Sequence, residues 1–143
     1  MVRWVCPRCD REFDKARQGH VCVPGGTVDE TFAGRPDYQR AAYDEILAFL
    51  RGLGPVHEDA VKVGVFLKAD RKLAEIRPMA RALSVELYLP RPIEGDERVV
   101  RHYAIGRGRF VNVVRLTGPG QVDERLRDRL AEAYEDAATN LHT

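Results

Sequence analysis

Three cysteines and one histidine near the N-terminus have the types and spacing of a metal site. They form the pattern C-x2-C-x10-H-x-C, at Cys6, Cys9, His20 and Cys22. Thiolate and imidazole are ligands that Zn²⁺ prefers, and four of them close a tetrahedral shell. Cys-Pro-Arg-Cys can turn tightly enough to aim two thiolates at one point, and His20 and Cys22 share a face of an extended segment. We therefore expect one structural zinc ion here.

A redox dithiol is the alternative interpretation of the CxxC pair. That motif normally opens a helix after a strand, and Cys6 lies too near the start of the chain for a preceding strand. The stretch CPRCDREF resembles the first half of the common two-cysteine, two-histidine zinc fingers. The second half differs, because too few residues separate Phe13 from His20 for a full recognition helix. The DNA-reading role of such fingers is therefore not expected.

Basic and acidic residues are sorted along the chain, although the formal net charge is only +1. Residues 60–91 and 98–115 carry +4 and +5, whereas residues 36–59 and 121–143 each carry −3. A charge field of the whole protein that would hold nucleic acid or an anionic membrane is excluded, so only a local surface could bind a polyanion. The candidate residues on the predicted strands and at their edges are Lys62, Lys68, Arg71, Lys72, Arg101, Arg107 and Arg109. The alternative is that these cations only deter pairing between strand edges.

These patterns favour a non-enzymatic binding protein, in which the zinc module and the basic strands together recognise a macromolecular or anionic partner such as nucleic acid. Signatures of catalysis are poor. Ser84 is the only serine and no histidine adjoins it in sequence, and Gly106-Arg107-Gly108 lacks the third glycine of a dinucleotide loop.

Two other hypotheses remain open. The first is an enzyme or small-ligand-binding protein with a site between the sheet and the zinc module. Its candidate residues are Glu86, Tyr88, Arg101 and His102. The second is an interaction or dimerisation module anchored by an exposed Phe66 or Phe110.

Periodicity predicts the elements that must position these residues. Apolar residues recur at helical spacing over about residues 37–53 and 122–138. Between these helices, apolar and polar residues alternate in a way that favours half-buried strands. The strands are expected over residues 61–68, 73–77, 83–89, 99–105 and 110–116, the last two forming a hairpin.

This order predicts an α+β fold, with two helices packed on one face of a roughly five-stranded antiparallel sheet and an N-terminal zinc module. The chain divides into a zinc-finger-like module over 1–24, a linker over 25–36 and an α+β domain over 37–143. Within the linker, Thr27-Val28-Asp29-Glu30 has the form of a capping box, which allows one helical turn.

The α+β part resembles a known family in three stretches, VGVFLKADRKLAEIRP, ALSVELYLP and FVNVVRLTGPGQVDERLRDRLAEAYEDA. They are similar to an uncharacterised bacterial domain-of-unknown-function family, sometimes labelled predicted transport proteins and distantly similar to frataxin-like domains. The resemblance covers roughly residues 37–138 and implies an α–β–α layout without an established activity. Frataxins use acidic helix positions for iron. The matching helix offers only Asp37, Asp44 and Glu45, so iron binding is not carried over.

The composition is typical of a soluble globular protein. The chain has 143 residues, of which 44% are hydrophobic and 31% are charged. No apolar run approaches the ~20 residues of a transmembrane helix, and the N-terminus lacks the apolar core of a signal peptide. We therefore expect a cytoplasmic protein that does not bind membranes, and the sequence does not predict its oligomeric state.

Overall fold

The computed structural model describes residues 4–5, 12–13, 26–61 and 63–138. The four predicted zinc ligands and Lys62 lie outside these residues, so the zinc site stays a prediction. The elements of the described part are β1 (Trp4–Val5), β2 (Glu12–Phe13), α1 (Val28–Phe32), α2 (Asp37–Leu53), β3 (His57–Val61), β4 (Gly64–Lys68), β5 (Lys72–Pro78), β6 (Leu83–Leu89), β7 (Val99–Gly106), β8 (Arg109–Leu116) and α3 (Glu124–Ala138).

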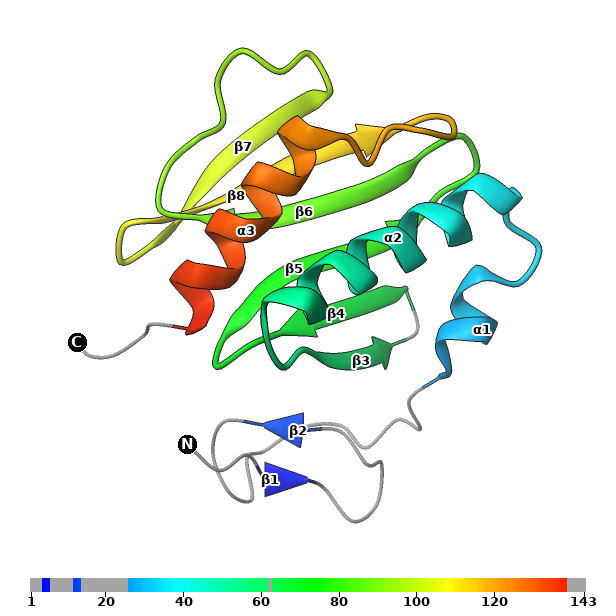
Figure 1. The fold of residues 1–143 in the computed structure, drawn as a ribbon, viewed down its shortest axis with the longest axis horizontal. Helices are drawn as coiled ribbons and strands as arrows, with labels where there is room; N and C mark the ends of the chain where they lie inside the picture. The colour runs from blue at the N-terminus through cyan, green and yellow to red at the C-terminus, as the bar shows by residue number, and fades with distance from the viewer. Residues whose placement is uncertain (1–3, 6–11, 14–25, 62, 139–143) are drawn as a thin grey trace.

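The main sheet is antiparallel and has the strand order β3-β4-β5-β6-β8-β7. Helices α2 and α3 lie across one face of it (Figure 1). The predicted α+β class, with two helices on one face of an antiparallel sheet, is therefore confirmed for the described residues. The strand count is corrected from about five to six. β1 and β2 form a separate short ribbon, in which Trp4 pairs with Phe13. A strand of two residues therefore does precede position 6, contrary to the expectation from its place near the start of the chain.

The sixth strand appears because one predicted strand, over residues 61–68, is really the end of one strand, a turn and a second strand. β3 and β4 form a hairpin in which Val61 pairs with Gly64. The two intervening residues are Lys62 and Val63, which carry no usual turn signal, so periodicity alone reads through them. Gly64 is required by close packing, since a Cβ there would lie 2.5 Å from the carbonyl oxygen of Ile76.

One apolar core fills the space between the helices and the inner face of the sheet. Side chains at helical spacing on α2 and α3 interlock with alternate residues of the strands, as both periodicities require. Fully buried members include Tyr43, Ile46, Leu50, Leu67, Ile76, Val85, Leu87, Leu126 and Leu130. The packed inner face fixes the register of the strands, and with it the side chains that face the other way.

The segment before α2 is part of this structure. Thr27 and Glu30 form the predicted capping box of α1, whose last residue, Phe32, is buried against Tyr43 with ring centroids 5.2 Å apart. This contact holds Thr31 and Arg35 beside the sheet.

Polar contacts fasten the long connection between β6 and β7. The side-chain oxygen of Asn112 accepts a hydrogen bond from the Ile93 N–H at 2.8 Å, and its amide donates to the Arg91 carbonyl at 3.1 Å. Further along, Arg98 donates to Asp96 at 3.0 and 2.8 Å and to Asp123, before α3, at 3.2 Å. These contacts hold the entry to β7, which carries Arg101.

Candidate functional site

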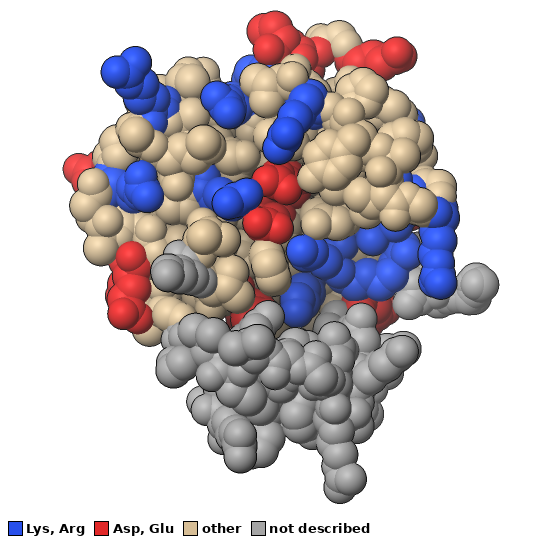
Figure 2. Space-filling view, turned by 180° about the vertical axis from the view of Figure 1, so that it is seen from behind, with Lys and Arg blue, Asp and Glu red and all other residues tan. Residues whose placement is uncertain are grey.

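The candidate site lies on the outer face of the sheet, which we define as the face opposite α2 and α3. No described helix covers it. In Figure 2, lysine and arginine side chains surround a central group of acidic side chains on this side of the molecule. The outer face therefore carries charges of both signs, so their pairing decides what it can bind.

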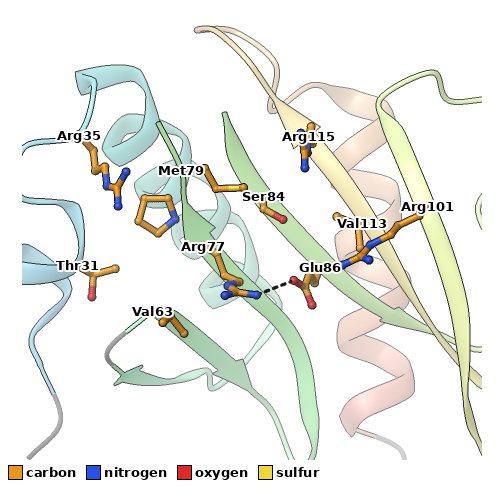
Figure 3. Close-up of a pocket in the computed structure, with 11 residues that line it drawn as sticks. Thr31, Arg35, Val63, Arg77, Met79, Ser84, Glu86, Arg101, Val113 and Arg115 are labelled. Carbon is orange, nitrogen blue, oxygen red and sulfur yellow. Dashed lines mark ion pairs between the residues drawn. The ribbon is translucent and has the colours of Figure 1, made fainter. Parts of the chain in front are cut away.

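A cavity of about 350 Å³ opens on this face, and four arginines line it. We call it the arginine hollow, and its arginines are Arg35, Arg77, Arg101 and Arg115. They come from four parts of the chain and reach toward the cavity from different sides (Figure 3). The lining also includes Thr31, Ser84, Glu86 and Val113.

Strand register explains how the arginines gather. Ser84 of β6 pairs with Arg77 of β5 on one side and with Arg115 of β8 on the other. Directly opposed residues of neighbouring strands project from the same face. One row along, Glu86 and Arg101 are linked in the same way through Val113 of β8. The hollow therefore depends on β8 lying between β6 and β7.

Positive charge in the hollow is only partly balanced. Glu86 is the one carboxylate that lines it, and its Oε2 lies 3.8 Å from Nη1 of Arg77. Arg77 also approaches Glu75 at 3.7 Å. Arg35, Arg101 and Arg115 are exposed, and none of them forms an ion pair with any residue of the described part of the chain.

Glu86 sits in an unfavourable place for a negative charge. Its side chain is buried, with the residue only 7% exposed. Burial raises the pKa of this carboxyl above its ordinary value, and the neighbouring Glu75 raises it further, while Arg77, Arg101 and Lys72 act in the opposite direction. The floor of the hollow therefore holds a carboxyl that is easier to protonate than an exposed one.

Aromatic rings and cations form a second cluster on the outer face, beside the hollow. Nζ of Lys72 lies 3.8 Å from the ring centroid of Phe66 and 5.3 Å from that of Tyr88. The guanidinium carbon of Arg109 lies 5.4 Å from the ring centroid of the same Tyr88, and that of Arg101 lies 5.6 Å from the ring centroid of Tyr103. Cation–π contacts of this kind hold the cations close to the rings.

Several of the predicted partner-binding residues are committed to internal contacts. Arg71 and Arg109 both reach Asp136 near the end of α3, at 3.4 and 3.1 Å. Burial lowers the pKa of Arg109, and the adjacent Arg71 lowers it further. Lys68 pairs with a buried Asp59 at 3.3 Å, and Lys72 approaches Glu75 at 3.5 Å. These four cations fasten the outer face and the end of α3.

The remaining predicted residues divide differently. Arg101 lines the hollow, whereas Arg107 is exposed at the turn between β7 and β8, with a φ of 54°. Sequence reasoning missed Arg35, Arg77 and Arg115. Alternation along β8 predicts that Arg115 projects from the face opposite to that of the core residues Val114 and Leu116. Only the strand order shows that Arg115 lies in the same row as Arg77.

The residues of the small-ligand hypothesis do not all meet. Glu86 and Arg101 share the hollow, and Tyr88 lies two residues along β6 from Glu86 on the same face. His102 follows Arg101 directly and pairs with Asn112, so strand alternation turns it to the opposite face. Phe66 and Phe110, the proposed interaction anchors, are both only partly exposed.

Two further observations concern metals and membranes. Within the described residues, no three histidine, cysteine, aspartate or glutamate side chains gather as a metal site would require. None of the helices in that part of the chain is long and apolar enough to cross a membrane.

The fold and the hollow define a class, an α+β domain with helices on one sheet face and a partly uncompensated arginine site on the other. The chain belongs to the family described as Domain of unknown function (DUF5655), whose match covers residues 28–137. The match begins at α1, so the family domain includes much of the predicted linker. No curated protein and no solved structure matches the chain.

Proposed function

We propose that this protein is a non-enzymatic binding protein that holds a single-stranded nucleic acid on the outer face of its sheet. The observation that carries the proposal is the set Arg35, Arg101 and Arg115, which converge on one hollow without a carboxylate partner among the described residues. Guanidinium groups match phosphate oxygens in charge and in fork geometry. Such a group of unpaired arginines is a natural anchor for phosphate.

Aromatic side chains favour a single strand over a duplex. Tyr88 and Tyr103 are both paired with Val111, so they lie in one row across β6, β8 and β7. Tyr103 is 42% exposed. Unpaired bases stack on such rings, whereas the bases of a duplex are already stacked on one another. The tyrosine row lies two rows from the row of Arg77 and Arg115, or roughly 13 Å at the usual strand rise.

The predicted zinc module completes this proposal. Cys6, Cys9, His20 and Cys22 would hold one structural zinc ion, which would stabilise a segment too short to build its own core. Basic residues beside these ligands, such as Arg8 and Arg11, would add to the phosphate contacts. Zinc content well below one per chain, together with unchanged folding of Cys22→Ser, would remove this part. The frataxin-like layout also stays a prediction.

Binding can be measured by fluorescence anisotropy with labelled single-stranded oligonucleotides of about 12 nucleotides, in a salt series that starts at about 50 mM. We expect affinity to fall as salt rises. In a plot of the logarithm of the binding constant against the logarithm of the salt concentration, each neutralised phosphate contributes about −0.7 to the slope. If each of the three unpaired arginines neutralises one phosphate charge, the hollow alone contributes a slope of about −2. The proposal would be overturned if a duplex of the same sequence bound as tightly as the single strand, or if no oligonucleotide bound at low salt.

Charge variants locate the contact. Arg115→Ala and Arg35→Ala should each weaken binding and reduce the salt slope by about 0.7. The matched control is Arg127→Ala, which removes the same charge from an exposed position on α3, behind the sheet. Equal effects of all three variants would mean that binding depends on net charge and not on the hollow.

A small anionic ligand is the second candidate, favoured by the concave shape of the hollow. Its volume of about 350 Å³ is that of a small ligand site. Competition by heparin, a polyanion without bases, distinguishes charge from base stacking. A nucleotide that protects the protein from heat while oligonucleotides do not bind would favour this candidate.

A further inference from the structure

The arginine hollow has features that suit one compact, multiply charged group better than a passing strand. Its guanidinium groups come from the loop after α1 and from β5, β7 and β8, and they surround a single concavity instead of following a track (Figure 3). A backbone phosphodiester carries one charge and has two of its oxygens in ester bonds. A terminal phosphate carries up to two charges and three free oxygens, so it can accept more hydrogen bonds from converging donors.

We propose that the arginine hollow binds the terminal phosphate of a nucleic-acid strand, as a phosphomonoester. This inference rests on the proposed function and names the part of the strand that enters the hollow. Arg35, Arg101 and Arg115 supply charge, and the hydroxyl of Ser84 supplies a further donor from the floor.

Ser84 provides an independent observation. It lies between Arg77 and Arg115 in the sheet and is only 5% exposed. Its side chain nevertheless lines the hollow, where Figure 3 draws it among the arginines. A hydroxyl both donates and accepts hydrogen bonds. An oxygen of a phosphate bound in the hollow would accept a hydrogen bond from it.

The aromatic row gives the rest of the strand a path. From a phosphate between Arg77 and Arg115, the row of Tyr88 and Tyr103 lies roughly 13 Å away, about the length of two nucleotides of extended single strand. The row between them contains Glu75 and Glu86 on β5 and β6 and Arg101 on β7. The two carboxylates repel phosphate, so a strand that begins in the hollow would place its first bases, and not its backbone, over β5 and β6.

Glu86 makes the proposal testable by a gain of affinity. It is the carboxylate that lines the hollow, and it repels a phosphate bound there. Glu86→Gln keeps the shape and a hydrogen-bonding group but removes the charge, so it should tighten binding of a phosphorylated end. Glu75→Gln is the matched control, since Glu75 also faces Arg77 but does not line the hollow.

The test compares three oligonucleotides of one sequence, with a 5′-phosphate, with a 3′-phosphate and with hydroxyls at both ends. Binding is measured by anisotropy, with the label inside the strand. We expect one phosphorylated end to bind about tenfold more tightly than the hydroxyl form. Ser84→Ala and Arg115→Ala should reduce this affinity ratio. In Glu86→Gln the ratio should be about threefold higher than in Glu75→Gln. Circular dichroism checks that each variant is folded.

The outcomes separate the two proposals. Equal affinity for all three oligonucleotides would overturn the terminal-phosphate site and leave nucleic-acid binding intact. Absence of binding to any oligonucleotide and to a nucleoside monophosphate would overturn both proposals. Binding of the monophosphate alone, lost in Arg115→Ala, would support the phosphate site and overturn the binding of a strand. A preference for phosphorylated ends that survives both Arg115→Ala and Ser84→Ala would place the phosphate elsewhere and overturn the inference.

Discussion

Replacing Asp96 by asparagine tests the contact that holds the start of β7. The Asp96 carboxylate accepts two side-chain hydrogen bonds from Arg98 and one from the Arg98 N–H at 2.9 Å. Both side chains are only 9% exposed. Arg98 also reaches Asp123, whose carboxylate accepts a hydrogen bond from the Leu126 N–H at the beginning of α3. The pair therefore couples the long connection after β6 to the helix layer.

The expected magnitude follows from the pKa of the carboxyl group. Hydrogen bonds from Arg98 lower the pKa of Asp96 from an ordinary 3.8 to about 2. Because the folded value is the lower one, the stabilisation is complete above about pH 4 and is lost as the pH falls toward 2. The shift corresponds to roughly 2 kcal/mol of unfolding free energy, and solvent near the loop reduces this to about 1–2 kcal/mol.

Urea unfolding followed by far-ultraviolet circular dichroism, at several pH values between 7 and 2.5, measures the effect. The free energy of unfolding of Asp96→Asn should be about 1–2 kcal/mol lower at pH 7, and the difference should narrow below pH 4. The neighbouring exposed carboxylate provides the control, since Glu97→Gln should cause no measurable change at pH 7. A difference that is the same at pH 3 and pH 7 would refute the argument from the carboxylate charge.

Three other substitutions test single contacts by the same unfolding measurement. Tyr43→Phe removes the hydrogen bond that the buried hydroxyl donates to Glu58 and should cost about 1–2 kcal/mol. Because burial raises the pKa of Tyr43, the wild type should lose stability above pH 10 and the variant should lose less. Asn112→Leu should cost about 2–3 kcal/mol, since it leaves two backbone groups of the β6–β7 connection unpaired. Gly64→Ala should cost about 1–3 kcal/mol through its clash with β5, whereas Gly52→Ala, in an open helical position, should be slightly stabilising.

Local pattern was sufficient to predict most of the elements. The helix over 37–53 and the strand over 83–89 have the bounds of α2 and β6, because strong apolar periodicity and flanking proline or glycine agree there. The hairpin of β3 and β4, which follows α2, was missed for the opposite reason. Its turn carries no glycine, asparagine or aspartate, so the alternating valines run through it without a break.

The candidate site depends on information that local pattern does not contain. Arg77 and Arg115 are far apart in the sequence and meet only because β8 pairs with β6. Arg71 and Arg109 looked equally suitable in the sequence, yet both reach Asp136 at the end of α3. Which cations remain unpaired is decided by where the acidic helices end, and the packing of the whole domain determines that.

The sorted charges of the sequence acquire a spatial meaning in the fold. Acidic α2 and α3 lie behind the sheet, so their carboxylates can neutralise only cations at its margins, as Asp136 does for Arg71. Cations in the middle of the outer face are separated from those helices by the sheet itself. Arg115 of β8 is in that position, and Arg101 faces the same cavity from the edge strand β7. The only carboxylate that lines this cavity is Glu86, whose pKa burial raises. Arginines paired with carboxylates would keep the protein in solution as well as unpaired arginines do, so solubility does not explain why these stay unpaired. Unpaired arginines around a cavity gain free energy only when an anion enters, which is why we place the binding site there.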